Sequence, residues 1–508
     1  MESVTPMNEL KIGWASRDVS TTKPVNIPGQ FSIRVSRGII DPVTVTALVI
    51  DNGADIAIFL SGDFVSIQSY LVTEVRDAVA KRIPGFPVEK ILMGCTHTHA
   101  GPSYYKNDAS AEVPHDDIEI ADSNEYRAFL VAQIAEAIAE AYAGRAPGGI
   151  AYGYGYAVAG HSRRVVFFDD RSKRPGAGGQ TGVIVEGHAA QSGNTNDPMF
   201  SHYEAGADHF VNLLYTFDPA GKLTGAVVNV PCPSQNSEAE RRLTASFWNE
   251  VREDVRAKHG NIFLLPQCAA AGDLHPRLLH YKQAEARRFR LKFGDENPKE
   301  VQEYLQRKDI ATRITAAFDE VLAWARKDIQ TALPLTHVVK TIELHRRFIT
   351  DEEYANELKQ YEELAKLGFK QDGTPDEKLS SDSRLWTRRR RSERILERYR
   401  IQAAQPRLPM ELHAIRLGDL AFVSNCFELF MDYQHRIQAR SPFVQTFVVQ
   451  LCGTPHEGTG GYLATERGAW GKGYSACQYC NQVSPQGGQE LVEETLRALQ
   501  AIHEAPTV

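Results

Sequence analysis

Residues 90–102 read KILMGCTHTHAGP, and this stretch decides how the rest of the chain is interpreted. The first six residues are apolar enough to form a buried strand, and Gly101-Pro102 is typical of a turn. In an extended segment, His97 and His99 point to the same side. Two imidazoles at the end of a buried strand are placed to meet a metal ion or a reacting group, although paired histidines in a loop also form ordinary backbone hydrogen bonds.

Predicted strands and helices alternate around this stretch. Residues 43–50 and 56–60 read as strands, because they are short apolar runs bounded by turn residues. Residues 64–82 and 126–142 read as helices, because apolar side chains recur every three or four positions. The strand–helix–strand rhythm predicts an α/β fold of mixed α+β type with a layered core.

The composition changes in the second half of the chain. Long, charged, helix-favouring stretches dominate residues 281–405, with one strand-like run at 337–344. We expect this block to be a mainly helical insertion or subdomain. Residues 1–280 and 406–508 would then form the catalytic domain.

Charge and cysteine content limit the classes of protein. The net charge of −7 gives no reason to expect a nucleic-acid partner, and no run of about 18 apolar residues predicts a transmembrane segment. The seven cysteines are odd in number and lie mostly in apolar runs, so a disulfide framework is not expected. With no signal-peptide pattern at the start, we expect a cytoplasmic protein, unless a leader has been removed. The sequence leaves the oligomeric state open, a homo-oligomer included.

Several segments together resemble the neutral/alkaline ceramidases. THTHAGP is similar to the THTHSGP of that family, and weaker matches follow in the family's order. These are KIGWA with RDVS at 11–20, the run 49–62, QCAAAGDLHP at 267–276, FELF at 427–430 and GGYLAT at 460–465. The resemblance implies the layered catalytic N-terminal domain of that superfamily.

The resemblance also implies a site for one zinc ion per chain. The family's ligands are the first His of THTH, a His before a proline, the Glu of GEFT and the Tyr of GYVTT. Matched singly, they correspond to His97, Glu428 and Tyr462, while Cys232 stands where the second histidine is expected. Thiolate is a good zinc ligand. Alternatively, Cys232 is a buried core thiol and the metal has one protein ligand fewer.

The family's serine nucleophile is absent. The segment that matches its GDxSP motif reads Gly272-Asp273-Leu274-His275-Pro276, so His275 stands in place of the serine. An imidazole more often moves protons than attacks a carbonyl. Attack by metal-activated water would replace the alkoxide, with His99 or His275 as acid or base. His275 could also be purely structural.

Two further side chains have expected roles. Arg163 is similar in position to an arginine near the family's substrate, and could hold a carboxylate or an oxyanion. Asp273 could orient His99 or His275.

These residues favour a zinc-dependent hydrolase that acts on a small polar amide, ester or sugar derivative rather than on ceramide. A metal-dependent carbohydrate lyase with a histidine base is the second hypothesis. An inactive binding module of the same fold is the third.

Overall fold

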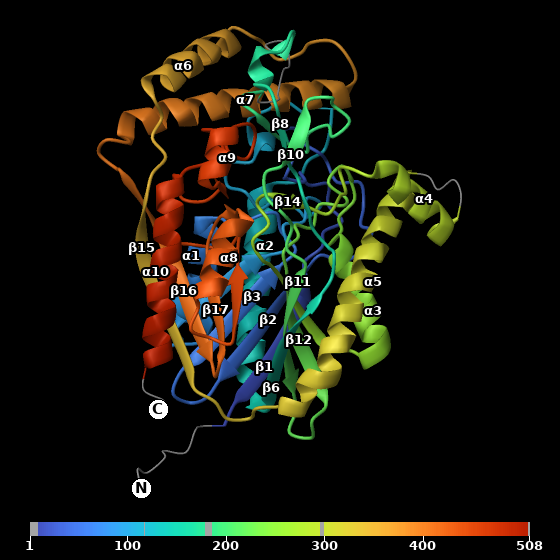
Figure 1. Cartoon of the computed structure of the whole chain (residues 1–508), viewed down its shortest axis with the longest axis vertical. Helices are drawn as coiled ribbons and strands as arrows, with labels where there is room; N and C mark the ends of the chain where they lie inside the picture. Colours follow the sequence, from blue (N-terminus) through green and yellow to red (C-terminus); the bar gives the residue numbers. More distant parts are fainter. Residues whose placement is uncertain (1–8, 116, 178–184, 295–298, 506–508) are drawn as a thin grey trace.

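Three larger β-sheets form the core of the protein, whose computed structural model describes residues 9–115, 117–177, 185–294 and 299–505. The strand orders are β4-β3-β2-β1-β5, β13-β12-β11-β6 and β15-β16-β17-β19 (Figure 1). The first sheet consists of β1 (Lys11–Asp18), β2 (Thr44–Asp51), β3 (Ile56–Gly62), β4 (Ile91–Cys95) and β5 (Ala146–Pro147). The second consists of β6 (Gly149–Tyr156), β11 (Phe210–Phe217), β12 (Leu223–Val230) and β13 (Phe263–Cys268). The third consists of β15 (Leu335–His345), β16 (Arg407–Leu417), β17 (Leu420–Ser424) and β19 (Gln445–Val449).

The sheets and helices stack in layers. Helices α1 (Ser69–Arg82) and α2 (Ser123–Ala143) cover one face of the first sheet through a shared apolar cluster. The other face of that sheet meets the second and third sheets, because Phe59, Leu214 and Phe422 lie in one buried cluster. The outer layer is made by α3 (Phe247–His259), α5 (Lys299–Ala325), α8 (Met431–Arg440) and α10 (Pro485–Glu504). The result is the mixed α/β fold with a layered core that the sequence predicts.

The helices and strand of the segment 281–405 lie in three separate parts of the fold. Its helix α5 packs on the second sheet, and its strand β15 pairs along its whole length with β16. Helices α6 (Asp351–Ala365) and α7 (Pro375–Ile401) pack on each other and lie across one end of the molecule (Figure 1). Both helices begin with a capping box, at Thr350 and Thr374, which satisfies backbone N–H groups at each start.

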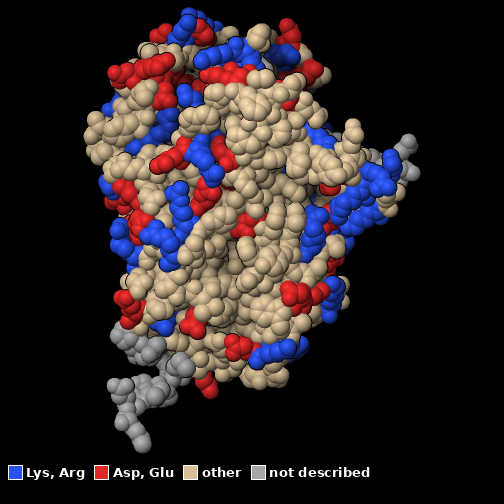
Figure 2. Space-filling model, viewed as in Figure 1, with Lys and Arg blue, Asp and Glu red and all other residues tan. Residues whose placement is uncertain are grey.

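The surface in view carries charges of both signs. Figure 2 shows Lys and Arg side chains gathered over α4 (Lys282–Phe293), and a largely uncharged area over the strands in the middle of this face. Within the described ranges, no helix combines the length and the apolar character that crossing a membrane requires.

Candidate functional site

The candidate site lies where parallel strands end. Strand β3 is parallel to β4, β12 to β13 and β17 to β19, so the carboxyl ends within each pair lie at the same edge. The segments that follow are joined by backbone hydrogen bonds, from Ser234 N to Thr96 O and from Leu451 N to Phe427 O. Ligand sites in open α/β sheets form at such carboxyl ends. The fold therefore brings together predicted motifs that are far apart in the sequence.

His97 follows β4 in a left-handed conformation, with φ of 61°. The extended geometry expected for this segment does not hold, because the backbone turns so that His97 Nδ1 can hydrogen-bond the carbonyl oxygen of Val65. This bond places the ring proton on Nδ1 and leaves the lone pair on Nε2. Nε2 lies 3.4 Å from Glu428 Oε2 and 3.4 Å from His99 Nε2.

Glu428 and Tyr462 are directly paired across two short parallel strands, β18 (Glu428–Leu429) and β20 (Tyr462–Leu463). Burial raises the pKa of Glu428, but its interactions with His97 and with the positive charge of Arg163 outweigh burial, so this pKa lies below its ordinary value. Glu428 is therefore an ionised carboxylate at neutral pH, in a side chain that is 16% exposed. Burial raises the pKa of the Tyr462 hydroxyl, which stays protonated unless a cation binds it.

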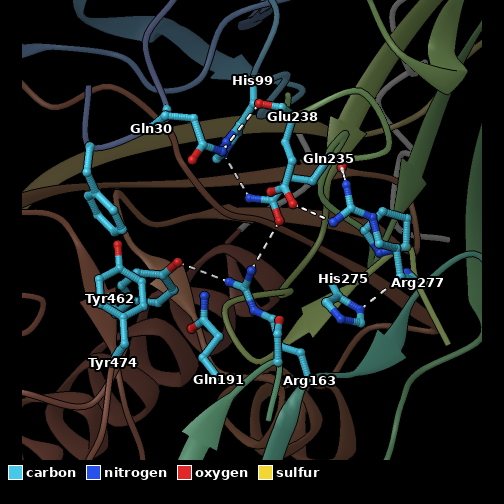
Figure 3. A pocket seen from close by; sticks show the side chains of 14 residues that line it. Gln30, His99, Arg163, Gln191, Gln235, Glu238, His275, Arg277, Tyr462 and Tyr474 are labelled. Carbon is cyan, nitrogen blue, oxygen red and sulfur yellow. Dashed lines mark hydrogen bonds and ion pairs between the residues drawn. The ribbon is translucent and has the colours of Figure 1, made fainter. Parts of the chain in front are cut away.

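Arg163 joins these residues to the rest of the site. Its side chain is 3% exposed, and one terminal nitrogen donates to Tyr462 Oη at 3.0 Å and to the Gly272 carbonyl at 2.9 Å. The other donates to Gln235 Oε1 at 3.1 Å (Figure 3). The same guanidinium lies 3.7 Å from Glu428 Oε2. Arg163 thus provides a fixed positive charge beside the His97–Glu428 pair.

Gln235 was not identified from the sequence, yet it fixes the state of His99. Because Gln235 Oε1 accepts from Arg163, its amide nitrogen faces His99 Nε2 and donates at 2.8 Å. His99 Nε2 is then an acceptor, and the ring proton is on Nδ1, which is buried without a hydrogen-bond partner. Burial first, and then the neighbouring His97 and the charge of Arg34, hold the pKa of His99 well below its ordinary value.

Cys232 has a different environment from the other expected ligands. Its thiol is 1% exposed, donates to the carbonyl oxygen of Ala159 at 3.3 Å, and lies in an apolar cluster with Trp248. Burial raises the pKa of this thiol well above its ordinary value. In the part of the chain that is described, no group of three or more His, Cys, Asp and Glu side chains is arranged to hold a metal ion. Of the expected ligands, His97, Glu428 and Tyr462 lie together, with His97 Nε2 3.4 Å from Glu428 Oε2 and Glu428 paired with Tyr462.

His275 and Asp273 face different parts of the structure. His275 lies on β14 (Leu274–His275), which pairs with β7 (His161–Ser162). Its Nδ1 accepts from the backbone N–H of Arg277 at 3.2 Å, so Nε2 carries the proton and is buried without a partner. Burial lowers the pKa of His275 to about 3, so the ring is neutral.

The Asp273 carboxylate accepts from the backbone N–H of Met431, the first residue of α8, at 3.0 Å. Burial raises the pKa of Asp273 to about 7. Within the described residues, no hydrogen bond joins this carboxylate to His99 or His275. Asp273 therefore caps a helix, and the orienting role expected for it has no contact that supports it.

Of the predicted site residues, His99, Arg163, His275 and Tyr462 line a pocket of about 260 Å³, whereas His97 and Glu428 are not among its lining residues. It is lined by Gly29, Gln30, Phe31, His99, Arg163, Gln191, Ser192, Gln235, Glu238, His275, Pro276, Arg277, Tyr462 and Tyr474 (Figure 3). Four buried polar atoms of lining residues have no hydrogen-bond partner: His99 Nδ1, Arg163 Nε, His275 Nε2 and Gln191 Oε1. The first three are N–H donors and the fourth is an acceptor. Buried polar groups in folded proteins usually have a hydrogen-bond partner, so these four atoms are candidates for contact with a ligand, although other unpartnered atoms lie elsewhere in the described chain.

The comparisons with known proteins find the fold but no close relative. No family model and no curated protein sequence matches the chain. A solved structure of neutral ceramidase from Pseudomonas aeruginosa is similar with a TM-score of 0.65 and 15% identity, over 99% of this chain and 76% of that one. A structure described as ceramidase complexed with C2 is similar with a TM-score of 0.64, at the same identity and coverage. The chain therefore has the neutral ceramidase fold.

Proposed function

We propose that the chain is a zinc-dependent hydrolase that acts on a small polar molecule with a carbonyl group. The observation that carries this proposal is the set of three unpartnered N–H donors, on His99, Arg163 and His275, at one pocket. Such donors match an oxygen-rich ligand, because each would otherwise remain desolvated without a hydrogen bond. The ceramidase fold supports a hydrolytic reaction by analogy.

The residues present fit a bound cation. His97 Nε2 presents a lone pair 3.4 Å from an ionised carboxylate oxygen of Glu428, and no proton lies between them in this tautomer. With Tyr462, these residues would hold the metal through three protein groups, and zinc sites that catalyse reactions keep a fourth position open. When bound there, zinc supplies Lewis acidity, which polarises a carbonyl and lowers the pKa of a water molecule. Cys232 is not needed for such a set.

The chain's own groups position the substrate and stabilise its charge. Arg163 Nε and His275 Nε2 are fixed donors in a buried region, where hydrogen bonds to a developing oxyanion are strongest. Because its pKa is about 3, His275 acts in this proposal as a neutral donor and not as a base. The same property disfavours the carbohydrate lyase, which needs a histidine base.

The size and lining of the pocket favour a small substrate over ceramide. Its volume of about 260 Å³ is at or below the lower end of ligand pockets, which run from roughly 300 Å³ upward. Three of its lining side chains are glutamines, at positions 30, 191 and 235. A long alkyl chain would leave Gln191 Oε1 and the N–H groups of His99, Arg163 and His275 without partners.

The test is turnover in ¹⁸O-labelled water, measured by mass spectrometry on a panel of amides, esters and glycosides of sugars and amino acids. Hydrolysis adds one labelled oxygen to a product. His97→Ala is the control, which should abolish turnover. A product that absorbs in the ultraviolet and carries no label would establish elimination instead. Absence of both turnover and bound metal across the panel would leave a binding module.

A further inference from the structure

A continuous row of aromatic rings leads from α7 to the inner site. The Tyr462 ring lies 5.7 Å from the Arg163 guanidinium, and Tyr474 packs edge-on against Tyr462 with ring centroids 5.9 Å apart. Phe31 packs edge-on against Tyr474 at 5.6 Å. All three rings line the pocket, and Phe31 is 39% exposed, so the row runs from the pocket's rim to its interior.

Arg391, on α7, lies beside Phe31 at the exposed end of this row and is not itself one of the residues that line the pocket. Its guanidinium lies 4.3 Å from the centre of the Phe31 ring. In the described chain, no carboxylate forms an ion pair with Arg391. The two arginines that precede it on α7 are engaged, since Arg389 donates to the Leu364 carbonyl and Arg390 pairs with Glu393 at 2.8 Å. A cation held against an aromatic ring, with no anion beside it, is available to a ligand.

The opposite side of the pocket is polar. In Figure 3, Tyr462 and Tyr474 lie on one side of the pocket, and Gln235 and His275 lie on the other. A ligand that fills this space needs a flat C–H face for the rings and oxygen atoms for the amide and imidazole groups. A pyranose ring has both, with C–H groups on its faces and hydroxyl groups around its edge.

From these features we infer that the substrate is an acidic carbohydrate. One sugar ring packs against Phe31 and Tyr474, and its carboxylate or sulfate group pairs with Arg391. This inference rests on the proposed function for the location of the reaction, and it deepens that function by naming a substrate class. Arg391 is then a specificity residue, since it contacts the anionic substituent and not the reacting bond.

The experiment measures binding alone, so that it does not depend on turnover. Titration calorimetry would compare methyl β-D-glucuronide, methyl β-D-glucoside and glucose 6-sulfate on the full chain and on Arg391→Gln. The glucuronide should bind the unmodified protein about fivefold more tightly than the glucoside. This is the gain in affinity expected from one partly exposed ion pair. Arg391→Gln should remove that difference. The sulfate shows whether the shape of the anion matters.

Arg390→Gln is the matched control, because it removes the same charge from the same helix but from a side chain that already pairs with Glu393. It should leave the preference for glucuronide intact, and Phe31→Ala should weaken both methyl glycosides. Melting curves would establish that each variant is folded. Equal affinity for glucuronide and glucoside, or an unchanged preference in Arg391→Gln, would overturn the inference. Failure of turnover with preserved glucuronide binding would count against the hydrolase only.

Discussion

The Nε2 atoms of His97 and His99 lie 3.4 Å apart, and neither carries the ring proton. His97 donates its proton from Nδ1 to Val65, and the Gln235 amide donates to His99 Nε2. The lone pair of His99 Nε2 is therefore taken by Gln235, while the lone pair of His97 Nε2 and the Glu428 carboxylate face each other at 3.4 Å. Such a concentration of negative charge is stabilised by a cation.

Metal content should depend on His97 and Glu428 and not on Cys232. His97→Ala and Glu428→Gln remove groups of the proposed zinc site, so both should lose bound zinc, as measured by elemental analysis. Cys232→Ser should retain it, because the thiol donates to Ala159 instead. A cobalt-substituted protein without a thiolate charge-transfer band would agree. Loss of the metal in Cys232→Ser would restore the cysteine as a ligand.

Gly29→Ala should destabilise the protein and displace His99. A Cβ at Gly29 would lie 2.7 Å from His99 Cγ, and the residue has φ of +103°. Gly85→Ala is the control, because its φ of +79° costs similar backbone strain while nothing lies within 4 Å. Urea unfolding should show a larger loss for Gly29→Ala, by about 1 kcal/mol or more for overpacking. Equal losses would mean that His99 moves without cost.

Arg163→Lys should lower stability despite keeping the charge. Lysine cannot reproduce the fork that contacts Gln235, Gly272 and Tyr462, so buried acceptors lose partners. We expect a loss of about 2 kcal/mol in the unfolding free energy. Arg277→Lys should cost less than about 1 kcal/mol, because its pair with Glu238 is partly exposed. If Arg163→Lys loses no more stability than the control, the hydrogen bonds of Arg163 do not stabilise the fold as expected.

Asp273→Asn should become relatively more stable than the unmodified protein as the pH rises. Burial raises the folded pKa of Asp273 to about 7, above its unfolded value near 4, so the native state retains a proton that the unfolded chain releases. Native stability therefore falls by about 1.4 kcal/mol per pH unit between these values. The asparagine variant has no such loss. The difference between the urea midpoints of the variant and the unmodified protein should therefore widen as the pH rises from 4 to 8.

Asp309→Asn provides the contrast. Burial acts on Asp309 too, but hydrogen bonds from Arg288 and Lys292 outweigh it and lower its pKa to about 2. This carboxylate is ionised in both states above pH 5, so its variant should show a constant difference from there upward. A constant difference for Asp273→Asn would contradict the raised pKa.

Regular periodicity made the framework predictable. The strand predicted at 43–50 is β2 (Thr44–Asp51), and the helix predicted at 126–142 is α2 (Ser123–Ala143). The helix predicted at 64–82 begins later, at Ser69, because Phe64 packs in the core outside the helix. Apolar spacing reports which face is buried and says less about where a helix begins.

The residues of the candidate site were harder to predict from sequence periodicity. Gln235, Gln191 and Phe31 lie in connecting segments or at the end of a short strand, where no periodic signal marks a functional side chain. Cys232 follows β12 as expected for a ligand, but its short side chain donates to a neighbouring carbonyl. Only the three-dimensional arrangement distinguishes a cysteine that faces a site from one that faces the core.

Helix α7 and the segments after β4, β12 and β13 are separate parts of the architecture. The helix places Arg391 against Phe31, while His97 follows β4 and Glu428 lies on β18. Exchange of residues along the outer helix could alter which molecules are admitted and leave the interior untouched. Divergence among proteins of this fold can therefore proceed by changing recognition and chemistry independently.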